Sequence, residues 1–150
     1  MELRFHIAND ADINTILAFM RQFYAIDRYP FDELIARTAL TDMVRDPSLG
    51  RAWLLYNKDK VIGYLVITFG YSLEYHGRDA FIDELFIEAS YRHQGIGTKV
   101  IEFALEACRE FGVHALHLEV ERTNIAGQAL YRKFGFEDHD RYLLTRRLEE

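Results

Sequence analysis

Two glycines in one short stretch are the residues whose spacing most directly indicates binding chemistry. Gly95 and Gly97 lie in a polar segment that separates two apolar ones. Because glycine has no Cβ, a loop that carries two of them lets its backbone N–H groups approach an anion closely. If the loop opens a helix, the helix dipole adds partial positive charge at the same place. The stretch is therefore a candidate phosphate cradle.

A strand and a helix are expected on either side of this loop. Residues 81–87 are mostly large and apolar without helical spacing, which is typical of a buried strand. After the loop, apolar residues recur at intervals of three and four, as on one face of a helix. These residues are Val100, Ile101, Ala104, Leu105, Cys108 and Phe111. Residues 81–108 thus predict a strand, a glycine loop and a helix.

Two common nucleotide-binding motifs fit the loop poorly. The dinucleotide motif Gly-x-Gly-x-x-Gly requires a glycine three residues after Gly97, where this chain has Val100. The P-loop requires Gly-Lys-Ser/Thr, but Gly97 is followed by Thr98 and then Lys99, in the reverse order.

The loop instead resembles the signature of a known superfamily. Residues 92–97 read Arg-His-Gln-Gly-Ile-Gly, which resembles the Arg/Gln-x-x-Gly-x-Gly/Ala motif of the GNAT superfamily of acetyl-CoA-dependent N-acetyltransferases. Residues 124–136 contain an Asn, an Ala and then Leu-Tyr-Arg-Lys-Phe-Gly-Phe, which resembles a second segment of that family. Two ordered matches are far more specific than either alone. The resemblance covers residues 81–136, and before them it rests on element order.

The resemblance implies a site for coenzyme A. Backbone groups near Phe86 and Ile87 would pair with its amide-bearing arm, as an added strand does, and the amides of residues 94–99 would hold its pyrophosphate. The expected cofactor contacts are Phe86, Ile87, Arg92, His93, Gln94, Gly95, Ile96, Gly97, Thr98, Lys99, Asn124, Tyr131 and Lys133.

Acetyl transfer to an amine requires two proton movements. An amine like that of lysine has a pKa of about 10.4, so deprotonation at neutral pH costs about 4–5 kcal/mol unless a base or water chain assists. The departing thiolate then needs a proton, which a tyrosine hydroxyl can donate. The resemblance assigns this role to Tyr131 and a cofactor or water contact to Asn124. Their seven-residue spacing places both on one side of a short helix, although a buried helix tyrosine is the structural alternative.

Asp83 and Glu84 are the candidate catalytic carboxylates. As neighbours on a strand they are expected to point to opposite faces, so that one of them looks into a cleft. On an alternating strand, Asp83 would face the same side as the position where relatives carry a base. Glu84 also recurs as an acid in related motifs. A solvated or salt-bridged carboxylate at a strand end explains either residue as well.

Acceptor contacts are expected outside the cofactor signature. Residues 70–79 are polar and rich in aromatic residues, which is typical of a loop that meets a ligand. Tyr71 and Glu74 in this loop, with Tyr29 and Asp83, are the candidate substrate-binding residues. An ordinary surface loop explains Tyr71 and Glu74 equally well.

The predicted element order is β-α-α-β-β-β-α-β-α-β-β, which is that of the GNAT superfamily. Hydrophobic spacing places strands at residues 3–7, 51–56, 61–69 and 81–87, a later strand at 116–120, and final strands near 136–138 and 141–148. Helices are expected after residues 9–12, from Asp32, before Phe111 and over residues 124–134. The fold class is α/β (α+β), with a mixed, mostly antiparallel sheet of about seven strands and helices on both faces.

Length and composition predict a single globular domain over residues 1–150, of which 49% are hydrophobic, and the resemblance implies that it is an N-acetyltransferase domain. Apolar runs such as 61–69 are far short of the roughly 20 residues that span a bilayer, and residues 1–4 begin no signal peptide. Cys108 is the single cysteine, so an internal disulfide is excluded and a cytoplasmic location is expected. The histidines show no metal spacing beyond His114 and His117, and no metal is expected.

The sequence therefore predicts transfer of an acetyl group from acetyl-CoA directly to a primary amine of a small molecule. The net charge of −6 disfavours nucleic acid and favours cationic substrates. Two alternatives remain, namely acetylation of a protein or peptide amine and a non-catalytic acyl-CoA sensor. No membrane partner is expected, and a homodimer through the final strands is left open.

Overall fold

The computed structural model describes residues 2–149, which form two compact units that divide after Glu119. The elements in chain order are β1 (Leu3–Ile7), η1 (Asp10–Asp12), α1 (Ile13–Ile26), α2 (Glu33–Arg45), β2 (Gly50–Asn57), β3 (Lys60–Ser72), β4 (Gly77–Ile87), η2 (Ala89–Tyr91), α3 (Ile96–Glu110), β5 (Ala115–His117) and α4 (Ile125–Lys133). The first unit contains the sheet with α1, α2 and α3, and the second contains α4.

The sheet has five strands in the order β1-β2-β3-β4-β5. The first four are antiparallel neighbours, whereas β5 runs parallel to β4. A parallel pair needs a crossover connection, which α3 provides between β4 and β5. The predicted mixed, mostly antiparallel sheet with helices on both faces is confirmed.

The strand count is lower than predicted. Residues 136–138 and 141–148 were expected to form two final strands, but no helix or strand is assigned from 136 to 149. The strand expected at 116–120 is confined to Ala115–His117. Alternation along one segment shows that it could cover a sheet, but a strand also needs a hydrogen-bonded neighbour, which the segment's own sequence does not specify.

The segment expected to be a loop over residues 70–79 is largely a hairpin. β3 continues to Ser72 and β4 begins at Gly77, so that the turn consists of residues 73–76. Tyr71 pairs with Arg78 in the ladder. Residues 70–79 are polar because they lie at the exposed end of two long strands, where half of the side chains face solvent.

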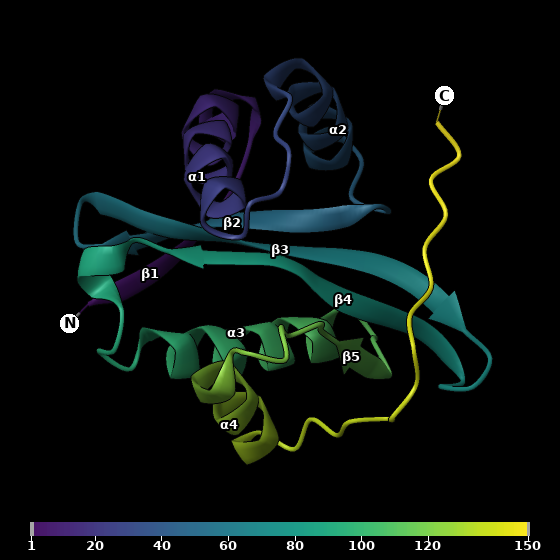
Figure 1. The fold of residues 1–150 in the computed structure, drawn as a ribbon. Helices are drawn as coiled ribbons and strands as arrows, with labels where there is room; N and C mark the ends of the chain where they lie inside the picture. Colours follow the sequence, from purple (N-terminus) through teal and green to yellow (C-terminus); the bar gives the residue numbers. More distant parts are fainter. Residues whose placement is uncertain (1, 150) are drawn as a thin grey trace. The chain divides into compact units, whose positions relative to one another are not determined.

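Helices cover both faces of the sheet in the first unit, with α1 and α2 on one side and α3 on the other (Figure 1). We call these sides the α1 face and the α3 face. On the α1 face Tyr64 and Phe86 pack with Phe19 of α1. On the α3 face Leu65 and Ile67 are buried with Val100. The faces thus have separate cores, and β3 contributes alternate residues to each.

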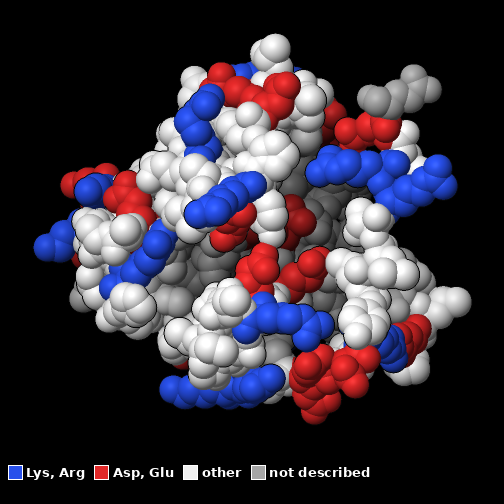
Figure 2. Space-filling model, viewed as in Figure 1, with Lys and Arg blue, Asp and Glu red and all other residues white. Residues whose placement is uncertain are grey.

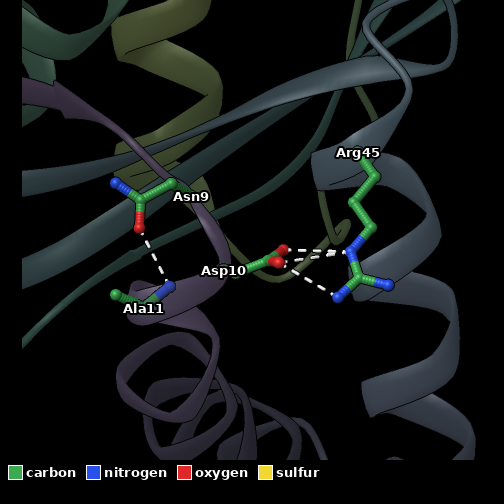
Figure 3. Close-up of polar contacts among 4 residues, drawn as sticks. All are labelled: Asn9, Asp10, Ala11 and Arg45. Carbon is green, nitrogen blue, oxygen red and sulfur yellow. Dashed lines mark hydrogen bonds and ion pairs between the residues drawn. The ribbon is translucent and has the colours of Figure 1, made fainter.

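Local polar contacts fix the ends of the first helices. The side chain of Asn9 accepts a hydrogen bond from the Ala11 N–H at 2.9 Å, and that of Asp12 accepts one from the Asn9 N–H at 3.0 Å. Arg45, at the end of α2, donates to Asp10 from Nε at 3.1 Å and from Nη2 at 3.0 Å (Figure 3). Asp32 caps α2 as predicted. These contacts connect η1 with the last turn of α2.

Within residues 2–149, no helix combines the length and apolar character needed to cross a membrane.

Candidate functional site

A β-bulge at Asp83 determines how the two candidate carboxylates are presented. Val66 of β3 pairs with Glu84, but the next residue, Ile67, pairs with Ile82, so Asp83 is the extra residue. Ile82 and Leu85 both pack against the α3-face core. Strict alternation cannot place residues three apart on one face, so the bulge absorbs the difference. The bulge thus removes the strict alternation on which the prediction of opposite faces for Asp83 and Glu84 rests.

Glu84 is held by two tyrosine hydroxyls from different elements. Tyr64 of β3 donates to Oε1 of Glu84 at 2.7 Å, and Tyr24 of α1 donates a hydrogen bond to Oε2. Tyr64 is fully buried, whereas Tyr24 and Glu84 are half-buried. Both oxygens of Glu84 therefore have a donor, and the residue lies on the α1 face.

The environment raises the pKa of every ionisable group in this cluster. Burial raises the pKa of Glu84, the two tyrosine hydrogen bonds oppose that shift, and the charge of Asp83 adds to it. Burial, followed by the influence of Glu84, raises the pKa of Tyr24 and Tyr64, which keeps both hydroxyls protonated. Asp83 also acts on both tyrosines, so it lies near the same cluster.

Asp83 differs from Glu84 in its accessibility. Its side chain is exposed to solvent, although partial enclosure by protein raises its pKa. Among residues 2–149, none donates a hydrogen bond to its carboxylate. A carboxylate with free lone pairs and a raised pKa can accept a proton from a bound group. Glu84, whose oxygens are both occupied, is less suited to that role.

The glycine loop has the geometry of an anion cradle. Gly95 is the N-cap of α3 with φ of 80°, and a Cβ built there would meet no atom within 4 Å. His93 also has a positive φ of 61°. Left-handed residues next to a helix N-terminus form concave arrangements of N–H groups. Open space over Gly95 is consistent with room for a ligand oxygen.

Two side chains of the predicted signature donate hydrogen bonds to backbone carbonyls beside this loop. Arg92 donates from Nε to the Ile87 carbonyl at 2.8 Å, and Gln94 donates from Nε2 to the Ser90 carbonyl at 2.9 Å. Within the described chain, no acceptor is assigned to the loop N–H groups of His93, Gln94 and Gly95. The N–H groups of the first turn of α3 have no intrahelical acceptor by geometry. The loop thus fits a pyrophosphate.

β4 has an open edge beside the cradle. β5 pairs with β4 at residues 79–81, and beyond Phe81 no described strand pairs with that edge. The Glu88 N–H bonds the Ile62 carbonyl on β3, so alternation directs the backbone groups of Phe86 to β3 and those of Leu85 and Ile87 to the open edge. The sequence prediction named Phe86 and Ile87, and the geometry favours Ile87 and Leu85.

The predicted acceptor residues are dispersed in the first unit. The Tyr29 N–H donates to the Tyr24 carbonyl at 2.9 Å, so Tyr29 follows directly on the end of α1. Tyr71 is an exposed residue of β3, and its alternation with Phe69, which packs on the α3-face core, assigns it to the α3 face. Glu74 lies in the turn at 73–76. The structure therefore does not bring Tyr71 together with the carboxylates.

Three predicted residues belong to the second unit. Asn124 caps α4, because its side-chain oxygen accepts from the Gly127 N–H at 2.9 Å. Tyr131 lies on α4, contacts the Phe136 ring edge-on at a centroid distance of 6.0 Å, and has its pKa raised by burial. Lys133 is the last residue of α4. The cap leaves the Asn124 amide nitrogen as its remaining donor.

Tyr24, Tyr64 and Leu85 are site residues that sequence reasoning missed. Tyr24 and Tyr64 lie in apolar segments, where hydrophobic spacing by itself indicates core positions. A buried tyrosine usually finds a partner for its hydroxyl, and that rule is the signal that could have indicated them. Neither spacing nor residue type could have indicated Leu85, since its contribution is a backbone edge.

Two other residues named from the sequence, His117 and Cys108, have structural surroundings that account for them. His117 lies 3.0 Å from Asp79 through Nε2 and Oδ2, and no group of three His, Cys, Asp or Glu residues within 2–149 could hold a metal ion. Cys108 is buried on the α3 face, and burial raises its pKa to about 11. Acidic and basic side chains are interspersed over the face shown in Figure 2.

Curated relatives match part of the chain. A thialysine N-epsilon-acetyltransferase from Bos taurus is 33% identical over 78 residues, covering 52% of this chain and 45% of the relative. A ribosomal protein bS18-alanine N-acetyltransferase from Escherichia coli K12 is 32% identical over 60 residues, covering 40% of each protein. The matched segments thus span less than half of these relatives.

Solved structures share the fold over nearly the whole chain. The crystal structure of a predicted acetyltransferase with acetyl-CoA from Clostridium acetobutylicum superimposes with a TM-score of 0.81 at 18% identity, covering 97% of this chain and 96% of the other. The profile of the Acetyltransferase (GNAT) family matches residues 15–136, which is most of the sequence. The chain belongs to the acetyltransferase (GNAT) family.

Proposed function

We propose that this protein is an N-acetyltransferase that moves an acetyl group from acetyl-CoA directly to a primary amine of a small molecule. The observation that carries the proposal is the bulge on β4, which presents Asp83 beside Glu84 on the strand that leads into the glycine loop. Acceptor chemistry and donor binding are then assigned to neighbouring residues in the C-terminal half of one strand.

Acetyl-CoA would supply the activated acetyl thioester. The N–H groups of residues 93–98 would bind its pyrophosphate, and the open edge of β4, with the backbone groups of Leu85 and the N–H of Ile87, would bind its extended arm by strand addition. The acetyl-CoA named with the Clostridium acetobutylicum structure supports this assignment by fold alone.

Asp83 is the residue that we assign to proton removal. Its carboxylate takes a proton from the acceptor ammonium, directly or through water, and leaves a neutral amine. The amine nitrogen forms a bond to the acetyl carbonyl carbon as the carbon–sulfur bond breaks. Tyr131 gives its hydroxyl proton to the departing thiolate, and its raised pKa keeps that proton available at neutral pH. The amine nitrogen loses its second proton as the amide forms, and this proton restores the Tyr131 hydroxyl directly or through water. The proton held by Asp83 returns to solvent.

A cationic amine is the acceptor class that the site favours. Asp83 and Glu84 place two carboxylates together, and the chain has a net charge of −6. The relative from Bos taurus is named for the ε-nitrogen of thialysine, a primary amine on a flexible arm. Acetylation of a peptide or protein amine is the second candidate, and the Escherichia coli relative supports it. We place the reaction in the cytoplasm, where a lone thiol stays reduced.

Acetyl-CoA-dependent thiol release tests this function. The acceptor panel contains polyamines, aminoglycosides, amino acids and lysine peptides, and we expect release with at least one small cationic amine. Asp83→Asn should lose the activity, whereas Asp59→Asn in the β2–β3 turn is the matched control. Release with lysine peptides alone would favour the protein substrate. Binding of acetyl-CoA without release for any amine would indicate a sensor.

A further inference from the structure

We propose that Tyr24 is a positioning residue of the acceptor site, which fixes the Glu84 carboxylate beside Asp83 and connects residues 27–32 to it. This inference rests on the proposed function, because it assigns a role within the same site. Tyr24 would act through Glu84 rather than on the amine.

Three elements meet at Glu84. The carboxylate belongs to β4, Tyr64 donates to it from β3, and Tyr24 donates from the last turns of α1. A carboxylate with a separate donor on each oxygen keeps one orientation, because rotation would break both bonds. Glu84 then acts as a fixed negative charge next to Asp83.

The two tyrosines differ in what their removal would reveal. Tyr64 is fully buried and its ring packs with Phe19 and Phe86. Tyr64 is therefore part of the α1-face core as well as a hydrogen-bond donor to Glu84. Tyr24 is half-buried at the end of α1. Its hydroxyl can therefore be deleted with less effect on packing.

Tyr24 also contacts the connection between α1 and α2. Its ring meets the Phe31 ring edge-on at a centroid distance of 5.5 Å, and its carbonyl accepts from the Tyr29 N–H at 2.9 Å. The guanidinium of Arg21 lies over the Phe31 ring at 5.0 Å. Residues 29 and 31 are thereby held to Tyr24 through the main chain and the side chain. Tyr24 therefore contacts both this connection and the Glu84 carboxylate.

Tyr24→Phe removes the hydroxyl and retains the ring contact with Phe31. The matched control is Tyr56→Phe, since Tyr56 is a half-buried tyrosine that packs against the same core and lies on β2. No hydrogen bond is assigned to its hydroxyl within the described chain. Both variants should unfold in urea with one transition, which shows that each is folded.

Steady-state kinetics supply the first readout. For Tyr24→Phe we expect kcat with the accepted amine to fall by about tenfold or more, the size of one hydrogen bond to a charged group. The KM for acetyl-CoA should stay within about twofold of wild type. On a Glu84→Ala background, Tyr24→Phe should cause no further loss, because the partner of the Tyr24 hydroxyl is gone. Additive losses, or an unchanged kcat in Tyr24→Phe, would overturn the inference.

A titration of the free protein supplies a readout that needs no catalysis. The pKa of the Glu84 carboxyl can be followed by ¹³C NMR, and Asp83, Tyr24 and Tyr64 are the ionisable groups that act on it. Tyr24→Phe should raise this pKa, since the hydrogen bond stabilises the ionised form, and Tyr56→Phe should not change it. An unchanged pKa in Tyr24→Phe overturns the inference. A raised pKa in a protein that acetylates no amine would instead overturn the proposed function.

Discussion

The buried hydroxyl of Tyr64 donates a hydrogen bond to Oε1 of Glu84 at 2.7 Å, and thus joins the centre of β3 to the carboxylate next to the bulge. Tyr64→Phe removes this donor and leaves the ring in place. We expect the free energy of unfolding at neutral pH to fall by about 1–3 kcal/mol, because Glu84 loses a partner in a poorly solvated position. Urea unfolding measures the change.

The control for that variant is Tyr56→Phe, which should stay within about 0.5 kcal/mol of wild type, as substitutions away from specific interactions usually do. Equal stability of Tyr64→Phe and wild type would show that the hydrogen bond contributes nothing net.

Asp83→Asn should lower kcat by about 10²–10⁴-fold, the usual size of a general-base contribution. Wild-type kcat/KM should rise with pH as Asp83 ionises, and burial places this rise above the ordinary aspartate value of about 3.9. The variant should lack that limb of the profile. A pH profile that keeps the limb in Asp83→Asn would assign the proton acceptor to another group.

Asp83→Asn should also change how the free energy of unfolding depends on pH. The substitution should lower activity but raise stability at neutral pH. A carboxyl whose pKa is raised by folding binds its proton more tightly in the folded state. The free energy of unfolding therefore falls as the pH rises from the pKa of Asp83 in the unfolded state to its pKa in the folded state. Asp83→Asn should abolish that decrease and be relatively more stable at pH 7. Urea unfolding at several pH values, with Asp59→Asn as control, measures the slope.

Gly95→Asp should abolish coenzyme A binding measured by calorimetry, because it directs a carboxylate into the open space over the cradle. Gly112→Asp is matched closely, since Gly112 also has a positive φ, of 72°, and open space around its Cβ, but lies after the other end of α3. Both should lose stability from backbone strain. Equal coenzyme A affinities in the two variants would contradict the cradle.

Tyr131→Phe should preserve coenzyme A binding and lower kcat by roughly 10²-fold. The thiol of coenzyme A has a pKa near that of cysteine, about 8.5, so protonation of the thiolate is helpful rather than obligatory. Tyr142→Phe, in the exposed segment of the same unit, is the control. Wild-type kcat in Tyr131→Phe would make Tyr131 a packing residue.

Local signals in the sequence predicted the helix starts well. Asp32 and Asn124 each cap the helix expected after them, because a cap involves backbone groups two or three residues away. Asn9 caps the short helix η1, which was not predicted, and α1 begins after Asp12 without a side-chain cap. The glycine loop was predicted for a similar reason, since Gly95 and the start of α3 are adjacent in the chain.

The site around Glu84 could not be predicted in the same way. The bulge at Asp83 becomes visible when β3 is placed against β4, and the partners of Glu84 lie 60 and 20 residues earlier in the chain. The prediction of two final strands was wrong for a related reason. Residues 141–148 alternate suitably, but pairing depends on a neighbour that the segment itself does not encode.

The bulge also means that β4 carries one residue more than its pairing with β3 requires. Ile82 and Leu85 lie three residues apart and both pack against the α3-face core, because Asp83 is the extra residue between Ile82 and Glu84. Deleting Asp83 would bring Ile82 next to Glu84, so ordinary alternation would keep Ala80 and Ile82 on the α3 face. Deletion of Asp83 should therefore preserve the pairing of β4 and its core contacts while removing the bulge and its carboxylate.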